Sequence, residues 1–357
     1  MPPATAMPPA TARADPPLEI ACDESGYEGQ RLVGTPTDVF SHASVHLDRA
    51  AADGCMRRLR DLIRSPAQEY KATHLLRQKH RAVLSWFLGP DGPLQPAAGG
   101  RARVYLVDKA FLLVRTVVGL LAGGAAVPAE GDRPSDPRTR TMAVALYREG
   151  CRLPGAEPWH AFLLSANHLL GTRDGPEART SVASLFRLLD ELAGTGPPDP
   201  VAAVLAELRR SRARADLLRA RLSAHPPPVP VVEPLVSAIV RAVVYWGDAG
   251  RPVAIVHDRQ NTLSPERVAW LRETIRALAP AGGRLSGISL VDSRTEARVQ
   301  VADVLAGVAR KLASDALNGR GDAELARLLH PYVDPASIWA DQGSWDLLTA
   351  APAAGRG

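Results

Sequence analysis

Four short apolar runs along the chain share one pattern. Each has the length of a β-strand, is rich in aliphatic or β-branched residues, and ends on an aspartate. They are LEIACD (18–23), RVYLVD (103–108), VAIVHD (253–258) and GISLVD (287–292). A further stretch, VFSHASVHL (39–47), alternates roughly between apolar and polar residues. The pattern therefore predicts a strand at each of these positions.

Stretches with helical periodicity lie between these strands. They cover residues 48–64, 74–88, 109–122, 232–246, 265–279 and 296–316. Strands interleaved with helices predict an α/β fold, in which helices cover a sheet. The runs at 253–258 and 287–292 flank one predicted helix, as in a βαβ unit, so their carboxyl ends should lie at the same edge of the sheet.

Two regions depart from this alternation. Residues 138–225 show only helical patterns separated by Gly- and Pro-rich turns, and HPPPVP (225–230) leads back to strand-forming sequence. This predicts an all-helical insertion within the α/β domain. Residues 318–357 form a C-terminal extension with a short helix near 322–329.

The N-terminus and the cysteines indicate the compartment. Residues 1–17 repeat MPPATA in tandem, which predicts a disordered Pro/Ala tail without the regions of a signal peptide. The longest apolar stretch, 110–127, contains Arg115 and a Gly-Gly pair, so we expect a core helix and no membrane partner. Three scattered cysteines without C-x-x-C spacing predict reduced thiols in a cytoplasmic protein.

The formal net charge is +5 and the pI is about 9.4, which mildly favours a polyanionic partner. Only four of the 43 basic residues are Lys, so part of this excess reflects an Arg-rich composition. The segment at 207–222 contains six Arg and is a candidate phosphate-binding helix. We favour the alternative, a solvated helix of the insertion.

The aspartates at the strand ends are the first candidates for chemistry. Carboxyl ends of parallel strands lie along one edge of a sheet, so Asp23 and Asp258 could meet although they are far apart in sequence. The alternative is that each such Asp begins a turn or caps the next helix. Glu24 follows Asp23 directly. Because side chains alternate along a strand, Glu24 should face away and be a bystander.

The predicted helix at 296–316 supplies another acidic residue. Glu296, Gln300, Asp303 and Gly307 recur at spacings of four, three and four, which places them on one face. Asp303 has apolar neighbours on both sides, and a carboxylate in such a setting is costly unless it is paired or bound to a metal. Gly307 would allow a close approach of this helix to the sheet. The alternative is a solvated Asp303 on an amphipathic helix.

Five segments, taken in order, resemble one known family. They are CDESG, EYKATHLL, VYLVDKAF, AIVHDRQN and LVDSRTEARVQVADVLAG. They are similar to the uncharacterised domain-of-unknown-function family 3800 (DUF3800), and this resemblance implies a ribonuclease-H-like mixed sheet over residues 18–125 and 230–317. D-E-S-G at 23–26 and D-S-x(6)-Q-x-A-D at 292–303 are the most specific pieces.

The resemblance also implies a set of site residues. Ribonuclease-H-like nucleases place acidic residues on the first strand, beside the first major helix, at the end of a later central strand and on the C-terminal helix. The matching residues here are Asp23, Glu69, Asp258 and Asp303. Glu69 depends almost entirely on the resemblance, whereas the patterns above select the other three.

Such a set of carboxylates would bind Mg²⁺ or Mn²⁺, hard cations that prefer oxygen ligands. Two ions can clamp an in-line phosphoryl displacement, and we expect Asp23 to bridge them. Lys71 or Lys109 would contact a phosphate oxygen, and Ser293 and Gln300 would orient the ligands.

The main hypothesis is therefore a divalent-metal-dependent nuclease that hydrolyses phosphodiesters of DNA or RNA. The second hypothesis is a non-catalytic nucleic-acid- or protein-binding module that keeps the fold. The helical insertion, about a quarter of the chain, favours the second because the chemistry does not require it. The sequence leaves open whether the chain forms a homo-oligomer.

Overall fold

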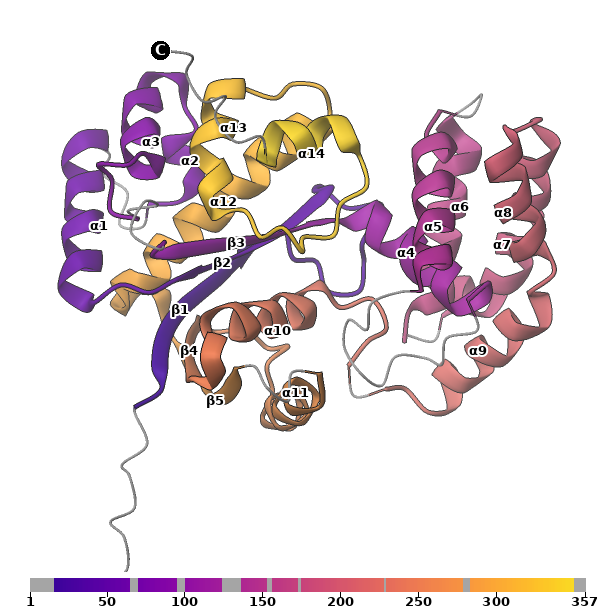
Figure 1. Ribbon diagram of the computed structural model, residues 1–357. Coiled ribbons are helices and arrows are strands. Elements are labelled where there is room, and N and C mark those ends of the chain that lie inside the picture. Colours follow the sequence, from indigo (N-terminus) through magenta and orange to yellow (C-terminus); the bar gives the residue numbers. More distant parts are fainter. Residues whose placement is uncertain are drawn as a thin grey trace, which may run out of the picture.

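The computed structural model describes residues 16–64, 70–94, 100–123, 136–152, 156–172, 175–227, 229–278 and 283–349. Within these ranges the chain folds around one five-stranded sheet (Figure 1). The strands are β1 (Leu18–Ser25), β2 (Val39–Val45), β3 (Ala102–Asp108), β4 (Pro252–Asp258) and β5 (Arg284–Val291). Each lies within a few residues of a predicted strand.

The strand order is β3-β2-β1-β4-β5. β2 runs antiparallel to both β1 and β3, whereas β1, β4 and β5 are parallel to one another. The sheet is therefore mixed and β1 is its central strand. This confirms the prediction of an α/β fold with a mixed sheet flanked by helices.

Helices cover both faces of the sheet and enclose two separate apolar cores. On one face lie α1 (Arg49–Ile63), α2 (Ala72–Leu75), α3 (Arg81–Leu88) and α12 (Ala297–Leu317). On the other lie α4 (Lys109–Leu121), α10 (Pro234–Trp246) and α11 (Pro265–Leu278). Side chains of β1 alternate between the cores: Ile20 and Cys22 pack toward α10, and Ala21 packs toward α12.

The described part of the region for which we predict a helical insertion contains five helices between α4 and α10. They are α5 (Pro137–Gly150), α6 (Ala156–Leu170), α7 (Pro176–Gly194), α8 (Asp199–Arg209) and α9 (Arg212–Ala224). Their buried side chains belong to the same apolar core as α4 and α10. The core on this face thus continues from the sheet into the helical region, which stands to one side in Figure 1.

The C-terminal segment covers one edge of the sheet. After α13 (Ala323–Leu329), the chain runs along β3, and the Asp334 and Ile338 amides donate to the carbonyls of Val104 and Leu106 at 2.8 and 2.9 Å. The chain ends its described part in α14 (Gln342–Thr349). Pairing of this kind satisfies an edge strand that would otherwise be open to aggregation.

Two further details bear on the sequence predictions. The helix predicted at 74–88 is interrupted at Arg77, whose backbone is extended (φ −71°, ψ 138°), and continues through the 3-10 turn η1 (Gln78–His80) into α3. Among the described residues, no helix is both long enough and apolar enough to cross a membrane.

Candidate active site at the carboxyl edge of the sheet

Two acidic residues end neighbouring parallel strands. Cys22 of β1 lies opposite His257 of β4, so Asp23 and Asp258, the next residues, reach the same edge side by side. Neighbouring strands lie about 4.8 Å apart. Ala21 and Val256 belong to the core on the α12 face, and the two-residue period of a strand places both carboxyl groups on that face.

Helix α12 brings Asp303 to the same place. The helix packs across β1 and β2, and the Ser41 hydroxyl donates to the Ala306 carbonyl at 2.5 Å. A Cβ on Gly307 would lie 2.5 Å from the Cβ of Ala72 and 3.9 Å from the hydroxyl of Ser25. Gly307 therefore does allow a close approach, but its tightest neighbour is α2 rather than the sheet.

The electrostatics show that these acids influence one another. Asp23 is only 6% exposed. Burial raises the pKa of Asp23 to about 9, with further increases from the negative charges of Glu24, Asp303 and Asp258. The Glu24 amide donates to Asp23 Oδ1 at 2.8 Å and opposes the rise. Without a cation, the Asp23 carboxyl therefore keeps its proton at neutral pH.

Asp258 is held by backbone donors. Its Oδ1 accepts hydrogen bonds from the amides of Arg259 (2.9 Å) and Ser293 (3.1 Å). Gln300 donates in turn to the Ser293 carbonyl at 2.7 Å. Ser293 and Gln300, which we expected to orient the ligands, thus lie behind Asp258 and connect it to α12.

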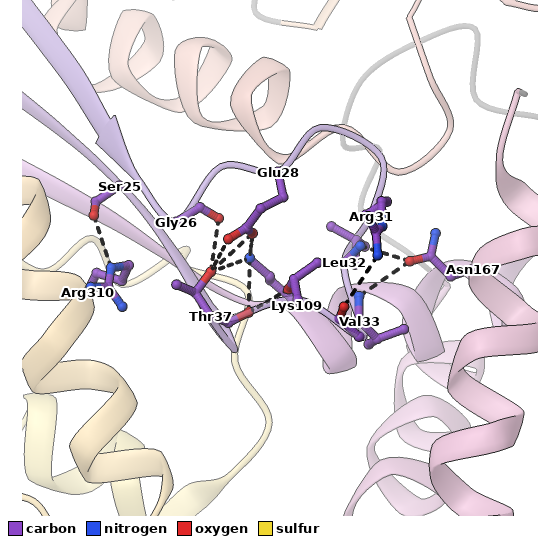
Figure 2. A network of polar contacts seen from close by, with 12 residues as sticks. Ser25, Gly26, Glu28, Arg31, Leu32, Val33, Thr37, Lys109, Asn167 and Arg310 are labelled. Atoms are coloured by element: carbon purple, nitrogen blue, oxygen red, sulfur yellow. Dashed lines mark hydrogen bonds and ion pairs between the residues drawn. The ribbon is translucent and has the colours of Figure 1, made fainter.

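The two lysines have different surroundings. Lys71 Nζ lies 2.9 Å from Asp303 Oδ2, so one basic side chain borders the carboxyl groups. Lys109 is buried and donates to the Glu28 carboxylate, to the Thr37 hydroxyl (2.6 Å) and to the Thr37 carbonyl (3.0 Å). Figure 2 shows that these contacts tie the loop after β1 to α4. All three Lys109 donors therefore have protein acceptors, which leaves Lys71 as the candidate for a phosphate contact.

Only two of the four predicted strand-end aspartates lie in this cluster. The Asp108 side chain caps α4 by accepting from the Phe111 amide, and it also accepts from the hydroxyl of Tyr147. Asp292 accepts from the Arg294 amide (3.0 Å) and pairs with its guanidinium (2.7 Å). The capping alternative thus holds for these two. Glu69, the remaining predicted ligand, lies outside the described residues.

The opposite face of the same edge carries a different polar group. Glu24 faces away from Asp23, as alternation predicted, and accepts a hydrogen bond from the side-chain Nε2 of Gln260. Its Oε2 lies 3.5 Å from Nε2 of the fully buried His257. The ring of His257 stacks on that of His42 with centroids 5.6 Å apart. Glu24 thus lies outside the cluster on the α12 face and has polar contacts of its own on the opposite face.

The hydrogen bonds of His257 show which of its ring nitrogens carries a hydrogen and which one faces Glu24. His257 Nδ1 lies 3.0 Å from the Asp258 carbonyl, and a carbonyl only accepts, so Nδ1 carries the hydrogen. Nε2 therefore faces the Glu24 carboxylate at 3.5 Å, where it can accept a hydrogen bond or, when protonated, donate one. Neither Nε2 nor Glu24 Oε2 has a hydrogen-bond partner within the described chain. Burial raises the pKa of Glu24, and His257 and Gln260 oppose the rise.

The cluster on the α12 face supplies hard oxygen donors of the kind that Mg²⁺ and Mn²⁺ prefer. As the described side chains stand, no group of three or more His, Cys, Asp or Glu forms a metal-binding arrangement. Comparison with protein-family models, curated proteins and solved structures finds no match to this chain. The geometry and chemistry of the site are thus the basis for any functional assignment.

Proposed function

We propose that the protein is a divalent-metal-dependent phosphodiesterase acting on nucleic acid, built on a ribonuclease-H-like form of the mixed sheet. The observation that carries the proposal is the cluster on the α12 face. Asp258 and Asp303 lie close enough to the buried Asp23 for their charges to raise its pKa. Such a group is stable only with a bound proton or a bound cation.

The positions of these acids support the ribonuclease-H-like part of the proposal. Asp23 lies on the central first strand, Asp258 at the end of the neighbouring strand, and Asp303 on a late helix that packs across β1. These are three of the four topological positions that the resemblance to the family implies. Glu69 keeps its proposed role on the resemblance alone.

Each residue of the cluster has a separate role in the proposed hydrolysis. Mg²⁺ or Mn²⁺ would supply an activated water and stabilise the leaving oxygen. Asp23, the most buried of the three acids, would give up its proton to bind a cation and would lie between Asp258 and Asp303. The Ser293 amide fixes one oxygen of Asp258. Lys71, 46% exposed at its side chain, can exchange Asp303 for a phosphate oxygen.

The test is cleavage of single-stranded, duplex and hybrid substrates in Mg²⁺ or Mn²⁺ by the wild type and by Asp23→Asn. We expect the variant to lose roughly 100-fold or more of the activity, because it removes the central ligand. Asp292→Asn is the matched control, since it changes a strand-end aspartate that pairs with Arg294 outside the cluster. No metal-dependent cleavage by the wild type, or equal cleavage by Asp23→Asn, would overturn the proposal.

The non-catalytic binding module remains a second candidate because of one contact. Lys71 neutralises Asp303 within the protein, without an ion. If Lys71 stays paired with Asp303 when metal is present, Asp303 cannot bind a cation. The carboxyl edge of the sheet then has a structural role and no catalytic one. Calorimetry distinguishes the two, since a module of this kind would bind nucleic acid but show no heat with Mn²⁺.

A further inference from the structure

Five basic side chains lie on elements that neighbour the helix of Asp303. They are Arg60 and Arg64 at the end of α1, Lys71 before α2, and Arg77 and Lys79 around η1. All five are exposed. Helices α1 and α2 both contact α12, and Lys71 pairs with Asp303 at the border of the cluster. We call these five residues the basic strip.

The charge of this segment is unusual for the chain. Residues 57–79 contain seven Arg or Lys and two acidic residues. The net charge of this short segment therefore equals the +5 of the entire chain. Two of the four lysines of the protein lie in it. The segment thus concentrates positive potential next to the cluster, where a general Arg-rich composition would have spread it evenly.

Acidic side chains neutralise little of the positive charge of the strip, because most of its residues have no acidic partner in the described chain. Lys71 pairs with Asp303, whereas Arg60, Arg64, Arg77 and Lys79 form no ion pair with any described residue. Burial, followed by the positive charges of Lys79 and Arg77, lowers the pKa of His80.

The Arg-rich segment of the insertion differs on this point. Arg209 pairs with Asp190 at 2.5 Å, and Arg210 pairs with Glu207 at 3.2 Å. Arg219 is buried and donates to backbone carbonyls near the end of α6. Arg209 and Arg210 thus have acidic partners and Arg219 serves the packing of the insertion, which disfavours a phosphate-binding role for 207–222.

The side chains of the strip also limit which features of a nucleic acid it can recognise. The only Phe, Trp or Tyr within residues 57–79 is Tyr70, and its side chain is 2% exposed. Base stacking needs an exposed ring, whereas phosphate contacts need only Arg and Lys and carry no sequence information. The strip would therefore bind a nucleic acid through its sugar-phosphate backbone and without sequence preference.

We infer that the basic strip binds the sugar-phosphate backbone of a nucleic acid and guides it to the carboxyl cluster. Lys71 is the junction, because it contacts Asp303 and is the strip residue next to the site. Delivery to the cluster rests on the proposed function, whereas binding by the strip does not.

The experiment measures fluorescence anisotropy of the full chain with a labelled random-sequence DNA of about 30 nucleotides, single-stranded and duplex, in EDTA between about 50 and 200 mM salt. We expect affinity to fall steeply with salt in the wild type. Arg77→Ser/Lys79→Ser should weaken binding roughly 10-fold and reduce the slope of log K against log salt by roughly 2.

Arg209→Ser/Arg210→Ser is the matched control, since it removes two exposed charges from the insertion. It should change affinity less than about twofold. The inference is overturned if the strip variant binds like the wild type or if the control loses as much. EDTA prevents metal-dependent cleavage, so this assay measures binding alone. If binding depends on the strip but the protein cleaves no substrate in Mg²⁺ or Mn²⁺, the proposed function is overturned while the strip inference stands.

Discussion

The two faces of the same sheet edge carry acidic residues in opposite situations. On the α12 face, Asp23 lies among other acids, and its pKa rises to about 9. On the α10 face, Glu24, the next residue, lies against His257 and accepts from Gln260. One face needs a proton or cation from outside, whereas on the other face Glu24 receives a hydrogen bond from the side chain of Gln260 within the fold. Two adjacent carboxylates are thus separated in role by the alternation of a strand.

The largest effect should come from the proton on Asp23. In metal-free protein the folded state keeps this proton up to pH about 9, whereas the unfolded chain loses it near its ordinary pKa of 3.8. The unfolded state therefore binds fewer protons in this window, and stability falls as pH rises. We expect Asp23→Asn to be more stable than the wild type in EDTA, by roughly 2 to 4 kcal/mol more at pH 8 than at pH 5.

Urea unfolding at several pH values measures this difference. Asp108 and Glu233 also have raised pKa values, about 6 and about 7, so the wild-type curve alone mixes several groups. The difference between wild type and variant isolates Asp23. A pH-independent difference would mean that the two faces do not differ as described.

The packing that brings α12 to this edge can be tested through Gly307. In Gly307→Ala the new methyl would lie 2.5 Å from the Cβ of Ala72, so α2 and Lys71 must shift. We expect a loss of about 1 to 3 kcal/mol. Gly119→Ala on α4 is the control, because its Cβ would meet nothing within 4 Å and should gain up to about 1 kcal/mol from helix propensity. A gain in both variants would show that α12 is not tightly packed here.

The smallest effect concerns Glu24. In Glu24→Gln the amide can donate to the lone pair of His257 Nε2 while its oxygen still accepts from Gln260, so stability should stay constant or rise by up to about 1 kcal/mol. Glu24→Ala removes the acceptor of the Gln260 side chain and leaves the buried His257 Nε2 without a polar neighbour, and it should cost about 1 to 3 kcal/mol. Urea midpoints at neutral pH compare the two. If the Gln variant is as unstable as the Ala variant, His257 carries a second proton and the pair is an ion pair.

Much of the architecture could be predicted because it is encoded locally. Apolar runs of strand length and helical periodicity located every strand of the sheet and the helices between them. Asp23 and Asp258 followed from the strand ends, and Asp303 from its apolar setting on one helix. The order of the strands needed long-range pairing, and so did the cover that the C-terminal segment gives to β3.

The same local signal could not separate ligands from caps. Asp108 and Asp292 end apolar runs as Asp23 does, but their partners are Tyr147 and Arg294. Similarly, only the fold shows that Lys109 meets Glu28, whereas Lys71 meets Asp303.

The group on the α10 face was missed for a related reason. It combines β2, β1 and β4, with Glu24 opposite His42 across one strand pair. The sequence showed each residue but not the register that aligns them. A histidine next to a strand-end aspartate, as in His257-Asp258, was the one local signal that could have indicated it.

We propose that the cluster on the α12 face binds a divalent cation in exchange for the proton on Asp23. Calorimetric titration with Mn²⁺ near pH 7, repeated in buffers of different ionisation enthalpy, measures the binding and the protons released together. We expect the wild type to release roughly one proton for each cluster occupied, and Asp23→Asn to bind at least about 10-fold more weakly without releasing a proton. Equal binding by both proteins, or Mn²⁺ binding by the wild type with no proton released, would contradict it.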